Sequence, residues 1–223
     1  AETPAGLAPK QGLVEAALTA RLGADTTLVS RVFDPLLDSA DVGPGHWNEI
    51  LDVIRSHPEA AVIVTHGTDT MAFTGAALSQ ALAGEERRVI LCGSMHPLGA
   101  GGDAEGNLSL AVDAARSGPP GVFLAFAGKL LGADGLVKHD SHKVDAFRAQ
   151  PQEKPGIPRH RRFATRRLAI LTLSPGIPAA MVEAALDPAF QTLLSWADDV
   201  RDIGIRANAD TPHDAQTARN FAA

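Results

Sequence analysis

A short apolar run followed by hydroxyl and carboxylate side chains is the part of the sequence best suited to chemistry. Residues 61–70 read AVIVTHGTDT, so a buried-type strand ends in a stretch that contains Thr68, Asp69 and Thr70. In an open α/β sheet, ligands bind just past the carboxyl ends of the strands. A threonine hydroxyl is a weak nucleophile that needs a neighbouring base, and the same residue types also cap helices. The segment therefore predicts a nucleophile site, a helix cap, or both together.

Lys138 is the candidate base for such a hydroxyl. It lies in the polar stretch ADGLVKHDSHKVDAF at 133–147. A lysine amine can deprotonate a hydroxyl, as it does in the Ser-Lys variants of hydrolytic sites. The competing interpretation is an ordinary solvated lysine, because the sequence does not show whether Lys138 is buried.

Two other patterns are weaker candidates for ligand binding. His139 and His142 flank Asp140, but their spacing is not that of a helical i, i+4 pair and no zinc motif is completed. The stretch Gly99–Ala104 fits G-x-G-x-x-A, but its glycines begin several residues after the apolar run at 89–92, and no acidic residue ends the next strand. We therefore expect no metal and no cofactor.

Composition excludes several classes of function. The chain has 223 residues, enough for one sizeable core or for one domain with a smaller one. Its net charge of −6 argues against a nucleic-acid-binding surface, because phosphate binding depends on Lys and Arg. No apolar stretch is long enough to span a bilayer. The single cysteine, Cys92, cannot form an internal disulfide, which fits a reducing compartment.

Hydrophobic periodicity predicts that helices and strands alternate along the chain. Apolar residues at helical spacing, with Pro or Gly near the ends, indicate helices, and short β-branched or apolar runs indicate strands. Helices are expected at 10–21, 44–57, 71–82, 107–116 and 178–186. Strands are expected at 26–33, 61–65, 89–92, 122–126 and 168–173.

This alternation predicts an α/β fold with a mainly parallel sheet, right-handed crossovers and flanking helices. The purely apolar strands suit a sheet that is covered on both faces. The segment 151–167 is rich in Pro and basic residues and is typical of a linker. We expect a first domain over 1–150 and a reduced second α/β domain over 168–223, with no structure predicted for the polar, Ala-rich tail after Asp199.

Several motifs, in this order, resemble the bacterial-type L-asparaginase family. THGTDTM at 65–71 resembles the second signature of that family, and VILCGSMHP at 89–97 resembles the strand and loop that follow it. Further matches are PLLDSADVGPGHW at 35–47, GDAEGNLSLAVDAA at 102–115, VKHDSHKVDAF at 137–147 and LTLSPGIP at 171–178. The resemblance covers about residues 5–180 and implies an asparaginase-like N-terminal catalytic domain of the short, cytoplasmic-like form.

Carried over residue by residue, the resemblance implies a Thr68–Lys138–Asp69 triad. Asp69 would also hold the α-amino group of the substrate, and Ser39 would bind its α-carboxylate. Ser94 would lie beside the side-chain amide, where the family usually has Ala. The implied reaction attacks that amide, forms a threonine-linked acyl-enzyme and releases ammonia before water frees aspartate, with backbone amides stabilising the oxyanion. Whether asparagine or glutamine is preferred depends on the volume around Ser39 and Ser94.

Two parts of the family pattern have no full counterpart here. The family opens with a strand and a TGGTI motif that supplies the usual nucleophile, and an assisting tyrosine follows; this sequence has no TGGTI motif and no tyrosine. The family's C-terminal domain is matched only by a short stretch after Pro178. We expect the nucleophile strand to belong to the protein but to lie outside this sequence. The alternatives are a catalytically silent relative that binds asparagine or aspartate, and an amidotransferase component that releases ammonia for a partner enzyme.

The resemblance also implies a homo-oligomer, either a dimer or a tetramer. The expected small-molecule partner is L-asparagine, with no nucleic acid and no membrane as partners. We expect no signal peptide and a cytoplasmic location.

Overall fold

The computed structural model describes residues 12–164 and 176–186, together with the backbone of four two-residue strands. Those strands are β1 (Glu2–Thr3), β2 (Gly6–Leu7), β9 (Ile205–Arg206) and β10 (Pro212–His213). Contacts divide the chain into two compact units, Ala1–Ala164 and Thr165–Ala223. The first unit contains the sheet and all of the site residues predicted from the sequence.

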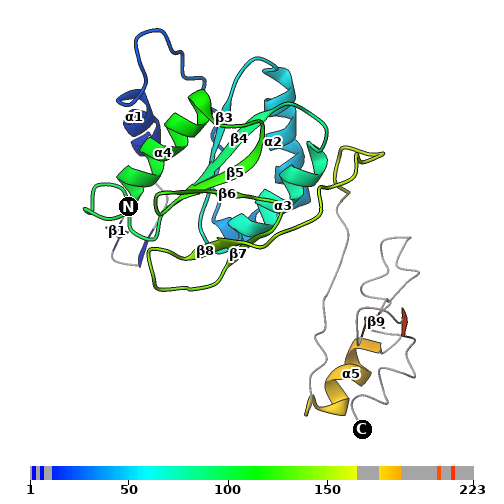
Figure 1. The fold of residues 1–223 in the computed structure, drawn as a ribbon. Coiled ribbons are helices and arrows are strands. Elements are labelled where there is room, and N and C mark those ends of the chain that lie inside the picture. The colour runs from blue at the N-terminus through cyan, green and yellow to red at the C-terminus, as the bar shows by residue number, and fades with distance from the viewer. Residues whose placement is uncertain are drawn as a thin grey trace. The chain divides into compact units, whose positions relative to one another are not determined.

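The central sheet of the first unit has four strands in the order β3-β4-β5-β6 (Figure 1). Its strands are β3 (Val62–Thr65), β4 (Arg88–Cys92), β5 (Gly121–Phe126) and β6 (Lys129–Gly132). The first three are parallel, and β6 returns antiparallel to β5. The turn between β5 and β6 is Ala127 and Gly128, both at positive φ (48° and 73°), as expected for a two-residue hairpin turn that matches the strand twist.

Helices cover both faces of this sheet because successive residues of a strand point to opposite sides. On β4, Val89 and Leu91 belong to one buried cluster and Ile90 and Cys92 to another. The first cluster includes residues of α2 (Pro44–Ser56) and α3 (Met71–Ala81), and the second includes residues of α1 (Leu13–Thr19) and α4 (Ala104–Ser117) (Figure 1). The predicted α/β fold with a mainly parallel sheet and flanking helices is confirmed.

Most of the predicted elements in the described residues are confirmed, with ends that move by a few residues. The helix expected at 107–116 begins earlier, at Ala104, and the helix expected at 178–186 is α5 (Ala179–Leu186). The strand expected at 168–173 lies outside the described residues. None of the helices in the described part of the chain is both long and apolar enough to cross a membrane.

The prediction of a strand at 26–33 was wrong. Residues 26–33 have no strand assignment, and Leu28, Val29 and Val32 are exposed. β-Branched residues fit a pleated surface, but they form a strand only beside another strand that supplies its hydrogen bonds and a face to pack on. In the described residues, β3 is an edge strand of the central sheet, and 26–33 does not pair with it.

A two-stranded ribbon that the sequence did not predict positions Lys138. Strand β7 (Leu136–Lys138) pairs antiparallel with β8 (Phe147–Ala149), and Lys138 is opposite Phe147. The Phe147 side chain is buried and meets Phe126 of β5 edge to face, with ring centroids 4.9 Å apart. This contact ties the ribbon to the core beside the sheet and so fixes the place from which Lys138 extends.

Candidate active site

The turn after β3 begins where the parallel strands end. Thr65 is in register with Cys92 of β4, and the His66 amide donates to the Cys92 carbonyl at 2.9 Å. The chain then turns through Thr68 and Asp69 before α3 starts at Met71. The segment singled out in the sequence therefore lies at the carboxyl end of the sheet, where α/β folds bind ligands.

Lys138 comes to this turn from β7. Its Nζ donates to Thr68 Oγ1 at 2.9 Å and to Asp69 Oδ1 at 2.7 Å. Only 15% of the Lys138 side chain is exposed, whereas 80% of the Asp69 side chain is exposed. The ordinary surface lysine considered from the sequence is therefore not what the structure has: the amine is held between a hydroxyl and a carboxylate.

The helix-cap interpretation of the same segment finds little support in the geometry. Thr70 occupies the N-cap position of α3, but its side chain makes no capping hydrogen bond. The Thr70 hydroxyl donates instead to the Ser39 carbonyl at 2.5 Å. The threonines of this turn thus bond to residues from other parts of the chain rather than to the first turn of the helix.

Ser39 lies directly against the turn. It begins a short 3-10 helix, Ser39–Asp41, whose first turn is fixed by a hydrogen bond from the Ala40 amide to Asp38 Oδ1 at 2.9 Å. A Cβ added to Gly67 would come within 2.7 Å of Ser39 Oγ and 2.8 Å of Ser39 Cβ. Because only glycine permits this approach, the structure brings the Ser39 side chain next to the residues that precede Thr68.

Ser94 lies at the same end of the sheet, in the loop after β4. Its hydroxyl donates to the carbonyl of His96 at 2.6 Å, within its own loop. Among the described residues, no hydrogen bond joins Ser94 to Thr68, Asp69 or Lys138. The structure thus places Ser94 near the end of the strand next to β3, but it does not bring the hydroxyl into the Lys138 cluster.

Sequence reasoning missed the residues that hold this loop, Asp103 and Asn107. The Asp103 carboxylate accepts from the amides of Met95 and His96 at 2.9 and 3.0 Å. Burial by itself would raise the pKa of Asp103, but these hydrogen bonds to the charged form outweigh it and the pKa is lowered. Both residues lie in the family-like motif at 102–115, for which the sequence predicts a helix from residue 107 but no role for these two side chains.

Asn107 ties the same loop to the β5–β6 turn. Its Nδ2 donates to the Gly93 carbonyl at 2.9 Å and to Asp103 at 3.0 Å, and its Oδ1 accepts from the Ala127 amide at 2.9 Å. The side chain is almost fully buried. The oxygen and nitrogen of this buried amide both have hydrogen-bond partners. The Asn107 side chain therefore holds the loop in one position, because any displacement would leave a buried polar group without a partner.

Cys92 is excluded as a nucleophile by its surroundings. The thiol is buried at the end of β4, and burial raises its pKa to about 12. A thiol acts as a nucleophile in its thiolate form, and this one stays neutral at physiological pH. The hydroxyl of Thr68 is therefore the better candidate at this end of the sheet.

Asp140 and His142, weighed from the sequence as part of a metal site, lie in a hydrogen-bonded turn. Asp140 Oδ1 accepts from the amides of His142 and Lys143 at 2.9 and 3.0 Å, and His142 Nδ1 is 2.9 Å from Ser141 Oγ. The described part of the chain contains no group of three or more His, Cys, Asp or Glu side chains placed to hold a metal ion.

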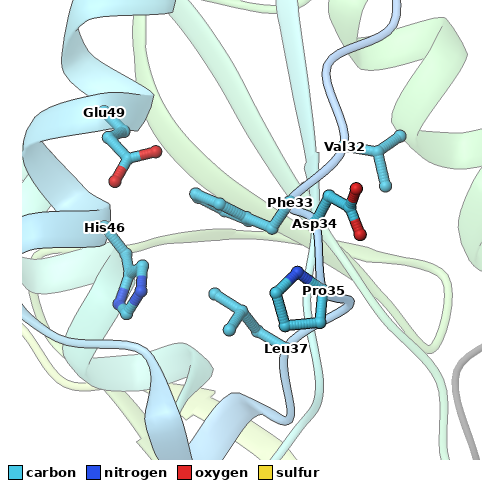
Figure 2. A pocket seen from close by; sticks show the side chains of 7 residues that line it. All are labelled: Val32, Phe33, Asp34, Pro35, Leu37, His46 and Glu49. Atoms are coloured by element: carbon cyan, nitrogen blue, oxygen red, sulfur yellow. The ribbon is translucent and has the colours of Figure 1, made fainter.

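A hollow lies between residues 32–37 and helix α2 (Figure 2). Its walls combine apolar side chains with Asp34, His46 and Glu49. Phe33 and His46 meet edge to face across it, with ring centroids 5.4 Å apart. None of the site residues predicted from the sequence lines this hollow.

One family model matches most of the chain. Residues 3–167 match the family model described as asparaginase, N-terminal. The chain is 36% identical over 116 residues to an L-asparaginase of Thermococcus kodakarensis, covering 51% of this chain and 35% of that protein. It is 35% identical over 127 residues to L-asparaginase 1 of Escherichia coli strain K12, covering 55% of this chain and 37% of that protein.

A differently named protein and a solved structure extend the comparison. The human 60 kDa lysophospholipase is 30% identical over 179 residues, covering 69% of this chain and 31% of that protein. The solved structure of the thermostable L-asparaginase from Thermococcus kodakarensis is similar with a TM-score of 0.65 and 26% identity, covering 82% of this chain and 63% of that one. The chain spans about a third of the length of these curated relatives. Because the family model matches most of its length, the chain belongs to the asparaginase family.

Proposed function

We propose that this chain carries part of the active site of an L-asparagine amidohydrolase, which releases aspartate and ammonia through a threonine-linked acyl-enzyme. One observation carries the proposal: Lys138 Nζ lies within hydrogen-bond distance of both Thr68 Oγ1 and Asp69 Oδ1. A hydroxyl beside an amine, with a carboxylate to orient the amine, is the arrangement that hydroxyl nucleophiles require. The L-asparaginases among the relatives support the choice of substrate.

The substrate's two charges suit the two sides of the turn. Asp69 is largely exposed, so its carboxylate can take the α-ammonium of asparagine while Lys138 remains beside Thr68. The Ser39 hydroxyl, packed against Gly67, is offered to the α-carboxylate. Ser94 is assigned to the side-chain amide, which requires its hydroxyl to leave the His96 carbonyl that it now bonds.

The chemistry is an acyl transfer in two halves. In its neutral form the Lys138 amine takes the proton from a threonine hydroxyl, and the oxygen attacks the amide carbon of the substrate. Backbone amides stabilise the oxyanion, the C–N bond breaks as the nitrogen receives the proton, and ammonia leaves. Water then attacks the ester by the same proton transfers and frees aspartate. Because these steps are proton and acyl transfers, we propose that the reaction uses no cofactor.

Thr68 is the threonine that this sequence offers for the acyl link. By resemblance, the family's usual nucleophile is a threonine in a TGGTI motif, which would act beside the Thr68–Lys138–Asp69 triad. We propose the same arrangement of parts for the whole protein: a catalytic domain over 1–150, a linker over 151–167, a second domain over 168–223, a homo-oligomeric assembly and a cytoplasmic location.

Ammonia release from L-asparagine by the whole protein tests the proposal. Release that is lost in Thr68→Val, with the acyl-enzyme trapped and located by mass spectrometry, supports it and identifies the nucleophile. Aspartate binding without any turnover by the whole protein overturns it in favour of a silent amino-acid-binding relative.

The match to the human lysophospholipase gives a second candidate, because it covers a larger share of this chain than either L-asparaginase match. The same hydroxyl and amine could attack the ester of a lysophospholipid. The polar surroundings of Asp69 and Ser39 suit a small zwitterion better than an acyl chain. Fatty-acid release from lysophosphatidylcholine, without ammonia release from asparagine, would show that the protein is a lysophospholipase and not an amidohydrolase.

A further inference from the structure

His66 lies two residues before Thr68 and has no part in the proposed chemistry. Both of its ring nitrogens have partners: Nδ1 lies 2.8 Å from the Gly67 carbonyl oxygen, and Nε2 lies 2.9 Å from Thr74 Oγ1. Thr74 comes from α3 and is buried, with 1% of its surface exposed. Trp47 of α2 donates its indole N–H to the same Thr74 oxygen at 3.0 Å.

The donors and acceptors in this chain of bonds can be ordered consistently around a neutral His66 ring. The indole N–H of Trp47 can only donate, so Thr74 Oγ1 accepts from it and has its own hydrogen free to donate to His66 Nε2. The Gly67 carbonyl can only accept, so Nδ1 carries the imidazole proton. In this order a neutral His66 carries its hydrogen on Nδ1 and accepts from the Thr74 hydroxyl at Nε2. Burial lowers the pKa of His66, although the hydrogen bond to Gly67 opposes this, and the neutral form is favoured.

The backbone around Gly67 is confined on both sides. Ser39 packs against the Gly67 Cα so closely that a Cβ there would clash with it. Directly after the neighbouring strand β4, a Cβ added to Gly93 would lie 2.4 Å from the His66 carbonyl oxygen. With these close approaches already present, the direction of the Gly67 carbonyl decides how the next peptide, and hence Thr68, is oriented.

We propose that His66 is a positioning residue for the candidate active site: held by the Thr74 hydroxyl as the Nδ1–H tautomer, it fixes the Gly67 carbonyl and thereby aims Thr68 and Asp69 at Lys138. The role in catalysis rests on the proposed function above, whereas the tautomer and the geometry do not. Trp47 and Thr74 act only through His66 and touch neither the hydroxyl of Thr68 nor the amine of Lys138 in the hydrogen bonds of the described residues.

Thr74→Val is the variant that isolates this role, because valine keeps the shape of threonine and removes the hydroxyl. In the wild type, nitrogen NMR of labelled histidine is expected to show His66 protonated on Nδ1. In Thr74→Val the Nε2 donor is lost, so the tautomer preference weakens and the amide resonances of Thr68 and Asp69 shift. We expect kcat for ammonia release to fall roughly tenfold or more through misplacement of the hydroxyl, while KM changes little.

Thr74→Ser restores the hydroxyl and is expected to restore both the tautomer and most of kcat. Thr19→Val removes an exposed hydroxyl on α1, which donates to Glu15, and is expected to leave both readouts unchanged. If circular dichroism shows that Thr74→Val does not fold, a comparison of His66→Asn with His66→Leu tests the same role. The asparagine amide can donate to the Gly67 carbonyl in place of Nδ1 and leucine cannot, so Asn is expected to retain the higher kcat.

An Nε2–H tautomer in the wild type, or an unchanged tautomer and kcat in Thr74→Val, overturns the positioning role. A failure of the proposed function gives a different pattern. If the tautomer and the Thr68 amide respond to Thr74→Val but the wild type releases no ammonia, the positioning of the turn stands and the amidohydrolase assignment falls. If ammonia is released equally by all Thr74 variants, the assignment stands and the positioning role falls.

Discussion

The Lys138 ammonium lies 2.7 Å from the Asp69 carboxylate, although 69 positions separate the two residues in the chain. The pair is asymmetric, since Lys138 is mostly buried and Asp69 is mostly exposed. An ion pair with one exposed partner contributes little to stability, because water screens it. What the arrangement does is hold an amine beside the Thr68 hydroxyl while leaving the carboxylate open to a cationic group of a ligand.

Gly67→Ala is expected to impair substrate binding more than folding. The new Cβ would lie 2.7 Å from Ser39 Oγ, so the Ser39 side chain must move away from the turn. We expect KM for asparagine to rise roughly tenfold or more, the scale of losing one hydrogen bond to a charged group. Gly45→Ala in α2 is the matched control, because nothing lies within 4 Å of its Cβ and alanine favours a helix. Equal KM values for the two variants would contradict the placement of Ser39.

Asp103 is expected to make the protein sensitive to acid. Its pKa in the folded protein is below the ordinary value of 3.8, because its carboxylate accepts hydrogen bonds from Met95 and His96 despite partial burial. A lowered folded pKa gives stability that is complete above the unfolded pKa and is lost as the pH falls through the folded pKa. Asp103→Asn should therefore unfold at a lower temperature than the wild type near pH 7, and the difference should begin to shrink below about pH 4 and vanish below the folded pKa. A constant difference down to low pH would show that the carboxylate does not hold the Ser94 loop through its charge.

Cys92 is expected to resist thiol reagents in the folded protein. Burial raises its pKa to about 12, so both access and ionisation are denied at pH 7 to 9. Ellman's reagent should label no thiol in the native protein and one thiol per chain in guanidinium chloride. Rapid labelling without denaturant, accompanied by loss of ammonia release, would place a reactive thiol near the site.

Asn48 is expected to stabilise the end of the first unit. Its Nδ2 donates to the Phe163 carbonyl at 2.7 Å, and its Oδ1 accepts from the Phe163 amide at 2.8 Å. Asn48→Ala leaves both backbone groups without this partner, so we expect the free energy of unfolding to fall by about 1–3 kcal/mol. Asp52→Ala removes an exposed ion pair to Arg162 on the same segment and should leave stability nearly unchanged. Two equal losses in denaturant titrations would contradict this ranking.

The three parallel strands of the central sheet and the helices around them were predictable because their signals are local, whereas the antiparallel strand β6 was not predicted. The apolar runs at 61–65, 89–92 and 122–126 each specify a strand, and the amphipathic segments between them specify the helices that cover it. The run at 26–33 is also rich in β-branched residues but forms no strand, since strand formation also needs a neighbour to pair with. Local propensity alone does not reveal which runs find one.

The candidate site was predictable in its residue types and only partly in its geometry. Thr68 and Asp69 follow a strand directly, so their place at the end of the sheet follows from the sequence. The approach of Lys138 depends on the β7–β8 ribbon, whose pairing joins a polar stretch to the core through Phe147. The roles of Asp103 and Asn107 were not predictable, because these side chains bond to backbone groups of neighbouring loops. A pattern of residue types in the sequence does not indicate such bonds.

Lys138 is the residue whose replacement tests the proposed chemistry most directly. Lys138→Met keeps the length of the side chain and removes the amine that contacts Thr68 and Asp69. The matched control is Lys129→Met, which removes an exposed lysine paired with Asp145. Ammonia release from L-asparagine by the whole protein should fall by roughly 10²–10⁴ in kcat for Lys138→Met, the range expected for losing a general acid–base group, and should stay at the wild-type rate for Lys129→Met. Ammonia release by Lys138→Met at the wild-type rate would contradict the proposed mechanism.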